Sequence, residues 1–253
     1  MAQYRDNPAG RLEKLLLDLY AATSGEQAQR QKEAWRAVVD LAGGEPSFPR
    51  QMSVVGIVVG LPRQVRESVE YLPLDEERKD HLLLHLDKVE AGMVQLATRQ
   101  TLYAMFTAFA TGGVVPQCAA ISSLSHCSYE LHHSMPEITV SDEDLARIVD
   151  LITDLMAEVA EAKLPAQVKR ALLHHLTTLL QAVHDIRFAG TQPVDDALFA
   201  LLGVAGRADC QEKASADSWW RKFVSVVQDL GNLLSVGQNA AQVGQGIAGF
   251  LNQ

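Results

Sequence analysis

The sequence predicts an all-α protein, a bundle of about nine helices with an additional C-terminal amphipathic helix rich in small residues. Apolar residues recur at spacings of three and four along most of the 253 residues. No segment shows the period-two alternation that a half-buried strand requires. Hydrophobic residues make up 47% of the chain and charged residues 21%, which is typical of a folded protein rather than a disordered one.

Helix start and stop signals place six helices in the first half of the chain. The second of these begins at a capping box formed by Ser24 and Gln27. We expect the third to kink near Pro62, because proline lacks the amide proton that a helix interior uses. The expected helices span 8–20, 24–44, 49–72, 75 onward, 98–110 and 116–133.

Three more helices and the tail helix follow. Ser141 with Asp144 caps the seventh, Pro165 lies near the start of the eighth, and Pro193 lies near the start of a short ninth. The segment before the tail helix is small and polar, as a linker would be. We therefore expect a helical core domain over 1–206, a linker over 207–217 and a C-terminal helix over 218–253.

Two stretches of the chain align without gaps at an offset of 90 residues. The segments 52–96 and 142–186 both read as helical hairpins, and Lys79 falls on Lys169 while His85 falls on His175. Any two amphipathic hairpins share part of such a pattern, so chance remains an alternative to an internal duplication. Two copies are too few for a solenoid.

The C-terminal segment carries the most informative pattern. After Trp219-Trp220-Arg221-Lys222, the residues from Phe223 to the end hold a single charge, Asp229. An apolar or small stripe lies opposite an uncharged polar one that comprises Gln228, Asn232, Ser235, Asn239 and Gln242. The predicted interaction residues are Trp219, Trp220, Arg221, Lys222, Val226, Leu230, Leu233, Gly237, Ala240, Gly244, Ile247, Ala248 and Leu251.

Three interpretations of this tail stay open. The small residues allow a second helix to approach closely, which favours self-association or docking on another protein. The paired tryptophans followed by two cations are typical of a membrane interface, although interfacial helices normally carry a charged polar face. In the third interpretation, the tail folds back and covers its own bundle.

A metal site is the main alternative to an interaction function. Glu77, His81 and His85 are spaced one turn apart on the helix that begins at Asp75, as in helical zinc sites. No glutamate stands beside the first histidine to act as a base, and Glu130-x-x-His133 has no second copy elsewhere. A solvated or partly packed helix face is the preferred explanation of the stripe, so we predict no cofactor and keep these residues as weak metal candidates.

Charge and cysteine content limit the partners and the compartment. The net charge of −9 and the absence of a dense basic stripe argue against nucleic acid. Cys118, Cys127 and Cys210 are odd in number, and the N-terminus shows no secretory signal, so we expect reduced cysteines and a cytoplasmic protein, with membrane association as an option. The uncharged stretch 100–129 is interrupted by Gly112-Gly113 and Pro116, which favours a buried hairpin over a membrane span.

From about residue 8 to 206 the chain resembles a group of uncharacterised all-helical bacterial proteins. The resemblance depends on Leu-x-x-Leu near the start and on four later motifs: Ala34-Trp35, Cys127-Ser128-Tyr129-Glu130-Leu131-His132, the segment Ser141-Asp142-Glu143-Asp144-Leu145, and Asp185-Ile186-Arg187-Phe188-Ala189-Gly190. It implies a helical, cytosolic core joined to variable ends, and it implies no activity.

The sequence therefore favours a non-enzymatic interaction or effector protein that acts through its C-terminal helix. Such a protein could act as an effector in a bacterial conflict or defence system. This hypothesis is not based on any particular residue. The alternatives are a metal-dependent enzyme using helix-borne histidines, and a structural scaffold whose tail covers its own bundle.

Overall fold

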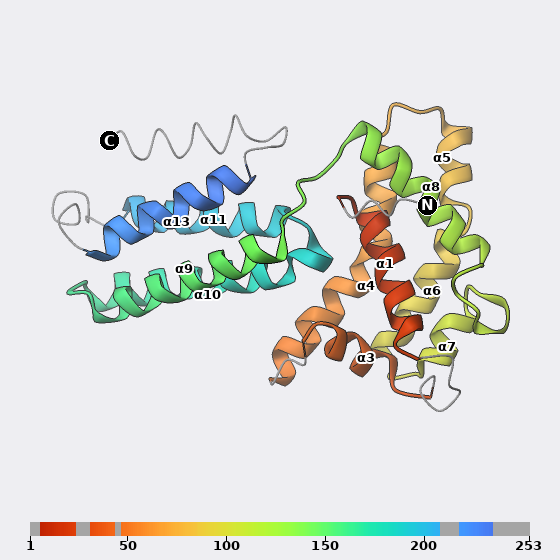
Figure 1. The fold of residues 1–253 in the computed structure, drawn as a ribbon, viewed down its shortest axis with the longest axis horizontal. Helices are drawn as coiled ribbons and strands as arrows, with labels where there is room; N and C mark the ends of the chain where they lie inside the picture. Colours follow the sequence, from red (N-terminus) through yellow and green to blue (C-terminus); the bar gives the residue numbers. More distant parts are fainter. Residues whose placement is uncertain (1–5, 24–30, 44–46, 208–217, 235–253) are drawn as a thin grey trace. The chain divides into compact units, whose positions relative to one another are not determined.

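The computed structural model describes residues 6–23, 31–43, 47–207 and 218–234 (Figure 1). These residues form eleven α-helices and one 3-10 turn. They contain no strand, and their one isolated β-bridge joins Glu33 to Thr101. The predicted all-α fold is confirmed.

The chain divides into two compact units, Met1–Glu137 and Ile138–Gln253. The sequence predicted one core domain to residue 206 followed by a separate tail helix. In the structure, helices on both sides of the predicted linker share the hydrophobic core of the second unit. Apolar periodicity identifies which face of a helix is buried, but not which helices share a core.

Unit 1 contains most of the short helices. In chain order they are α1 (Pro8–Ala21), α3 (Ala34–Leu41), α4 (Phe48–Glu70), α5 (Glu76–Leu83), α6 (Leu86–Ala97), α7 (Leu102–Thr107), the 3-10 turn Thr111–Gly113 and α8 (Ala119–Ser134). Helix α4 packs on α6 and α1, and α8 packs on α1. The uncharged stretch 100–129 contributes Met105, Phe106 and Leu124 to this core, as the sequence predicted.

Side-chain caps fix where several helices begin. Asn7 Oδ1 accepts from the Gly10 amide at 2.9 Å, and Asp75, Thr101 and Ser141 accept from the third residue after each of them. The predicted capping box at Ser24 lies outside the described residues, and the next helix among the described residues begins at Ala34. Helix α4 continues through Pro62, which is buried.

The predicted helix from Asp75 onward is two helices. Helix α5 ends at Leu83 and α6 begins at Leu86, with His85 in a non-helical conformation (φ −111°, ψ 1°) between them. Helix α7 begins four residues later than expected, because Arg99 adopts a left-handed conformation (φ 56°) that no continuous helix contains.

The described residues of unit 2 form four helices, α9 (Asp142–Glu161), α10 (Ala166–Ala189), α11 (Gln192–Arg207) and α13 (Ser218–Leu234). Helix α10 packs on both α9 and α11, and α13 returns to pack on α9. Fully buried core residues come from all four helices, among them Ile152, Leu176, Leu201 and Phe223. The start of the predicted C-terminal helix is therefore an integral part of unit 2.

Candidate functional site

The described part of α13 is amphipathic, as predicted. Val226 and Leu230 are each 1% exposed, whereas Gln228 and Asn232 face solvent. The two predicted stripes therefore lie on opposite faces of this helix. Trp219, Phe223 and Val227 lie on the same buried face of α13 as Val226 and Leu230.

The apolar face of α13 packs against other helices of the same molecule, in the core of unit 2. Trp219 is 2% exposed and belongs to the core of unit 2, so it lies at no membrane interface in this structure. Trp220 is half-buried, and its ring stacks on Phe223 with 5.3 Å between centroids. The sequence predicted Trp219, Val226 and Leu230 as contacts for an external partner. The structure corrects this, because α9 and its neighbours need an apolar fourth helix to complete their core.

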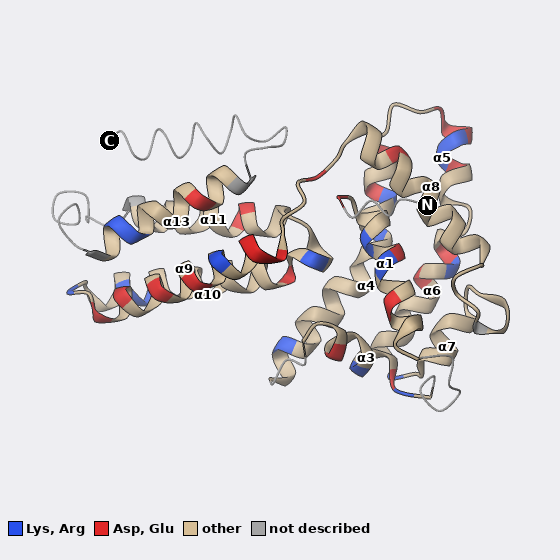
Figure 2. Cartoon of the chain, viewed as in Figure 1, with Lys and Arg blue, Asp and Glu red and all other residues tan. Residues whose placement is uncertain are grey.

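Lys222 fixes α13 against α9 at the edge of this core. Its Nζ donates to Glu158 Oε1 at 2.8 Å and lies 3.4 Å from Asp154 Oδ2. The hydrogen bond to Glu158 is the main cause of a raised pKa for Lys222. Helix α9 carries seven carboxylates and one arginine, which makes it the acidic helix of unit 2 (Figure 2). The i, i+4 pair of carboxylates on α9 was the sequence signal for this contact, and Arg221 beside Lys222 stays exposed.

Helix α9 covers α13 only as far as its own first turn. The two helices run antiparallel (Figure 1), and Lys222 lies level with Asp154 and Glu158. Because both helices rise about 1.5 Å per residue, Leu234 at the end of α13 is level with the start of α9 near Asp142. Helix α9 therefore matches the length of the described part of α13.

The remaining predicted interaction residues lie outside the described part of the chain. They are Gly237, Ala240, Gly244, Ile247, Ala248 and Leu251, together with the side chain of Leu233.

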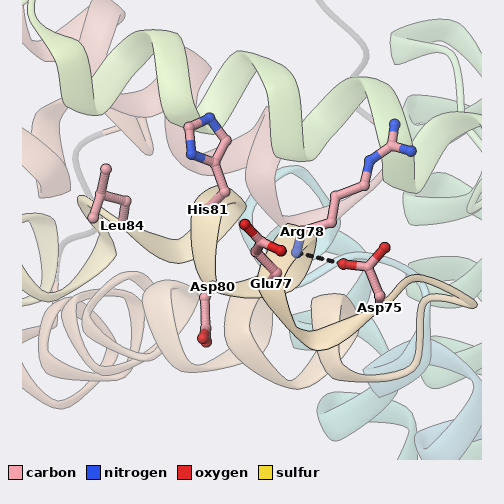
Figure 3. A pocket seen from close by; sticks show the side chains of 6 residues that line it. All are labelled: Asp75, Glu77, Arg78, Asp80, His81 and Leu84. Atoms are coloured by element: carbon pink, nitrogen blue, oxygen red, sulfur yellow. Dashed lines mark hydrogen bonds between the residues drawn. The ribbon is translucent and has the colours of Figure 1, made fainter.

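The predicted metal stripe is not assembled. Glu77 and His81 line a shallow hollow of about 440 Å³ with Asp75, Arg78, Asp80 and Leu84 (Figure 3). In that view Asp80 points to the side of α5 opposite His81. His85 is absent from the lining, since the helix ends before it. The described residues contain no group of three His, Cys, Asp or Glu side chains placed to hold a metal ion.

The pair Glu130 and His133 also has other partners. Glu130 Oε1 accepts from Arg78 Nη2 at 2.5 Å. His133 Nδ1 lies 2.8 Å from the Tyr129 carbonyl oxygen, and its ring centroid is 4.1 Å from that of Tyr129. These contacts join α5 to α8 and fold His133 onto its own helix.

Three buried groups have shifted acidities that the sequence did not predict. Burial raises the pKa of the Cys127 thiol to about 12, and its Sγ lies 3.2 Å from the Leu82 carbonyl oxygen. Burial raises the pKa of Asp195 to about 6, with the charge of Asp196 adding to the effect. Burial also raises the pKa of Glu13, against a hydrogen bond from Ser125 at 2.5 Å. None of them faces the hollow on α5.

No protein-family model, curated protein or solved structure matches this chain. Among the described helices, none combines the length and the apolar character needed to cross a membrane.

Proposed function

We propose that this chain is a non-enzymatic interaction protein that associates with a second copy of itself through residues 235–253. The observation that carries the proposal is that the apolar stripe, buried in unit 2 along the described part of α13, continues in the sequence past Leu234. Helix α9 buries the apolar stripe of α13 as far as Leu230 and begins level with its last turn. The stripe continues in the sequence as Gly237, Ala240, Gly244, Ile247 and Leu251.

The composition of 235–253 favours a protein partner. This segment contains no Asp, Glu, Lys or Arg, which suits a contact that removes side chains from water. It also contains six Asn and Gln residues, whose amides are costly in hydrocarbon but readily hydrogen-bond to one another across a protein interface. Its small residues let two such helices approach closely.

Unit 2 holds the start of α13 in a fixed position, from which residues 235–253 can associate with a second copy. Trp219 and Phe223 anchor the start of α13 in the core, and Lys222 holds its side against α9. A segment attached to a fixed helix loses less conformational entropy on association than one attached to a free chain. The truncation that tests the proposal should therefore begin after Leu234 and leave α13 intact.

The test compares the molar mass in solution of the full chain with that of a chain ending at Leu234. We expect the full chain to be larger than a monomer and the truncated chain to be monomeric, with α9, α10 and α11 equally protected from hydrogen exchange in both chains. Gly244→Leu should abolish the association because it fills the close-contact stripe. Gly246→Leu makes the same substitution on the opposite face of the predicted helix, four residues after Gln242, and should leave the association unchanged.

Two outcomes would reject the proposal. A full chain that is monomeric at 0.1 mM, a concentration of the order of weak dimer dissociation constants, has no self-association of this kind. A truncation that changes only co-sedimentation with vesicles of phosphatidylcholine and phosphatidylglycerol would identify a membrane-docking segment instead.

A further inference from the structure

The first turn of α1 is joined to the end of unit 1 by a network of polar side chains. We call it the N-terminal clasp, and it comprises Asp6, Asn7, Arg11, Ser128, His132 and Glu137. Asp6 Oδ2 lies 2.5 Å from His132 Nδ1. Asn7 Nδ2 donates to the Ser128 carbonyl oxygen at 3.1 Å. Asp6, Asn7, Arg11 and Ser128 are all buried.

Glu137, the last residue of unit 1, is held in two ways. Its amide donates to the Asp6 carbonyl oxygen at 2.7 Å. Its carboxylate accepts from Arg11 Nη1 at 2.5 Å and from Arg11 Nη2 at 3.2 Å, a bidentate pair. Between α8 and α9, residues 135–141 form no helix. The clasp therefore fixes the first half of this non-helical connector onto α1.

The ion pair in the clasp contributes little net stability, because burying its charges costs desolvation free energy. Arg11 is 7% exposed, and its Nε is buried without a hydrogen-bond partner. The Glu137 side chain is 31% exposed, so the cost falls on Arg11, whose buried guanidinium gives up hydration that it only partly regains. A contribution to the folding stability of unit 1 is therefore not a sufficient reason for an ion pair between Arg11 and Glu137.

Helix α1 is also held in unit 1 by apolar contacts. Leu12, Leu16 and Leu19 have no exposed surface, and they hold α1 in the apolar core of unit 1. The clasp lies at the opposite end from Leu19, around the first turn. Its polar contacts can break while these apolar contacts persist.

We propose that the N-terminal clasp is a conformational latch, which opens without unfolding unit 1 and so frees residues 135–137 to extend the connector. Opening lengthens the part of the connector that is not held on α1, because it then starts at the end of α8 rather than at Ile138. The latch is separate from the proposed function, because none of its residues belongs to 235–253.

Hydrogen exchange of the full-length protein, followed by mass spectrometry, tests the latch. Glu137→Gln keeps the shape of the side chain and removes its charge, so we expect exchange of amides 135–140 to rise about tenfold. Exchange in α4 and α6 should stay unchanged. The double variant Arg11→Met with Glu137→Leu replaces the ion pair by apolar contact and should exchange in this region no faster than the wild type.

Two results would overturn the latch. Faster exchange spread equally over α4, α6 and the connector in Glu137→Gln would show that the clasp only supports the fold of unit 1. Unchanged exchange of 135–140 in Glu137→Gln, together with wild-type behaviour of the double variant, would show that the ion pair does not hold the connector.

Discussion

Gly92 of α6 lies directly against Phe109, at a distance that leaves no room for a side chain. A Cβ atom on residue 92 would meet Phe109 Cδ1 at 2.8 Å and the Met105 carbonyl oxygen at 2.9 Å. Because one of these neighbours is backbone, α6 and α7 must separate to accept any larger residue. This approach sets the spacing of two of the helices that form the core of unit 1.

Gly92→Ala should therefore destabilise unit 1 by about 1–3 kcal/mol through overpacking. Gly56→Ala is the matched control, since no atom lies within 4 Å of its added Cβ. This control should gain about 0.5–1 kcal/mol from better helix propensity. Urea unfolding followed by circular dichroism measures both changes. Equal stabilities of the two variants would contradict the close approach of Gly92 and Phe109.

Trp219→Ala should destabilise unit 2 by about 3–5 kcal/mol, because it removes a large side chain that is 2% exposed in the core. Phe199→Ala is the control, since Phe199 is 44% exposed and its loss should cost less than about 1 kcal/mol. Thermal unfolding by circular dichroism compares them. If the two variants lost the same stability, α13 would not be docked on α9 in solution.

The sequence predicted secondary structure well where capping residues and apolar spacing agree. Ser141 caps α9 as expected, and Val226 and Leu230 lie on the face of α13 that their spacing indicated. The predicted stripe of Glu77, His81 and His85 does not form, because the helix breaks before His85. The sequence did not reveal this break, because neither glycine nor proline occurs there. An i, i+4 spacing has meaning only inside one continuous helix.

The sequence did not predict which helices share a core. An apolar residue such as Trp219 can contact a membrane, a second molecule or a helix of its own chain. The sequence pattern is the same in all three cases, so only the tertiary structure shows which contact is made. Lys222 was assigned to an interface for its charge, whereas its position beside Glu158 depends on the register between α13 and α9. Arg11 and Glu137 are 126 residues apart, so no local pattern indicates their pairing.

Asp195→Asn should stabilise unit 2 at neutral and alkaline pH. The pKa of Asp195 is raised from 3.8 to about 6, mainly by burial, so the folded state favours the protonated carboxyl. This contribution to stability is complete below pH 3.8 and is lost as the pH rises through about 6. The neutral amide does not suffer this loss. The variant should therefore exceed the wild type by about 1–3 kcal/mol at pH 8.

The difference between Asp195→Asn and the wild type should fall below about 1 kcal/mol near pH 4, where Asp195 is protonated in the folded state and only partly ionised in the unfolded state. Urea unfolding at several pH values measures it, in a Trp35→Phe background that leaves Trp219 and Trp220 as reporters of unit 2. A gap that stays constant with pH would show that Asp195 does not titrate in the folded state as described.

Cys127 should resist thiol reagents at pH 8 until unit 1 unfolds. It is 1% exposed, and burial raises its pKa to about 12, so its thiolate fraction is very small. Cys118 is half-buried and should react first. A Cys210→Ala background leaves these two thiols, and the time course of labelling with a thiol-reactive dye in increasing urea separates them. Rapid labelling of Cys127 in the native protein would contradict its placement between α8 and α5.

Lys79 and Lys169 make the same contact in the two units. Lys79 Nζ donates to the Glu70 carbonyl oxygen at 3.0 Å, and Lys169 Nζ donates to the Ala160 carbonyl oxygen at 2.7 Å. In each hairpin a lysine at the start of the second helix satisfies a carbonyl in the last turn of the first helix. Both donor and acceptor recur at the offset of 90 residues, which favours an internal duplication over chance.

This equivalence predicts that Lys79→Met and Lys169→Met cost the same stability, about 0.5–1.5 kcal/mol each, because each removes one hydrogen bond from a charged donor to a helix end. The cost should fall on unit 1 for the first variant and on unit 2 for the second, as hydrogen exchange of each unit reports. Lys163→Met, in the exposed turn before α10, should be neutral. A cost in only one of the two hairpins would show that the shared contact is coincidental, because duplicated hairpins should use it alike.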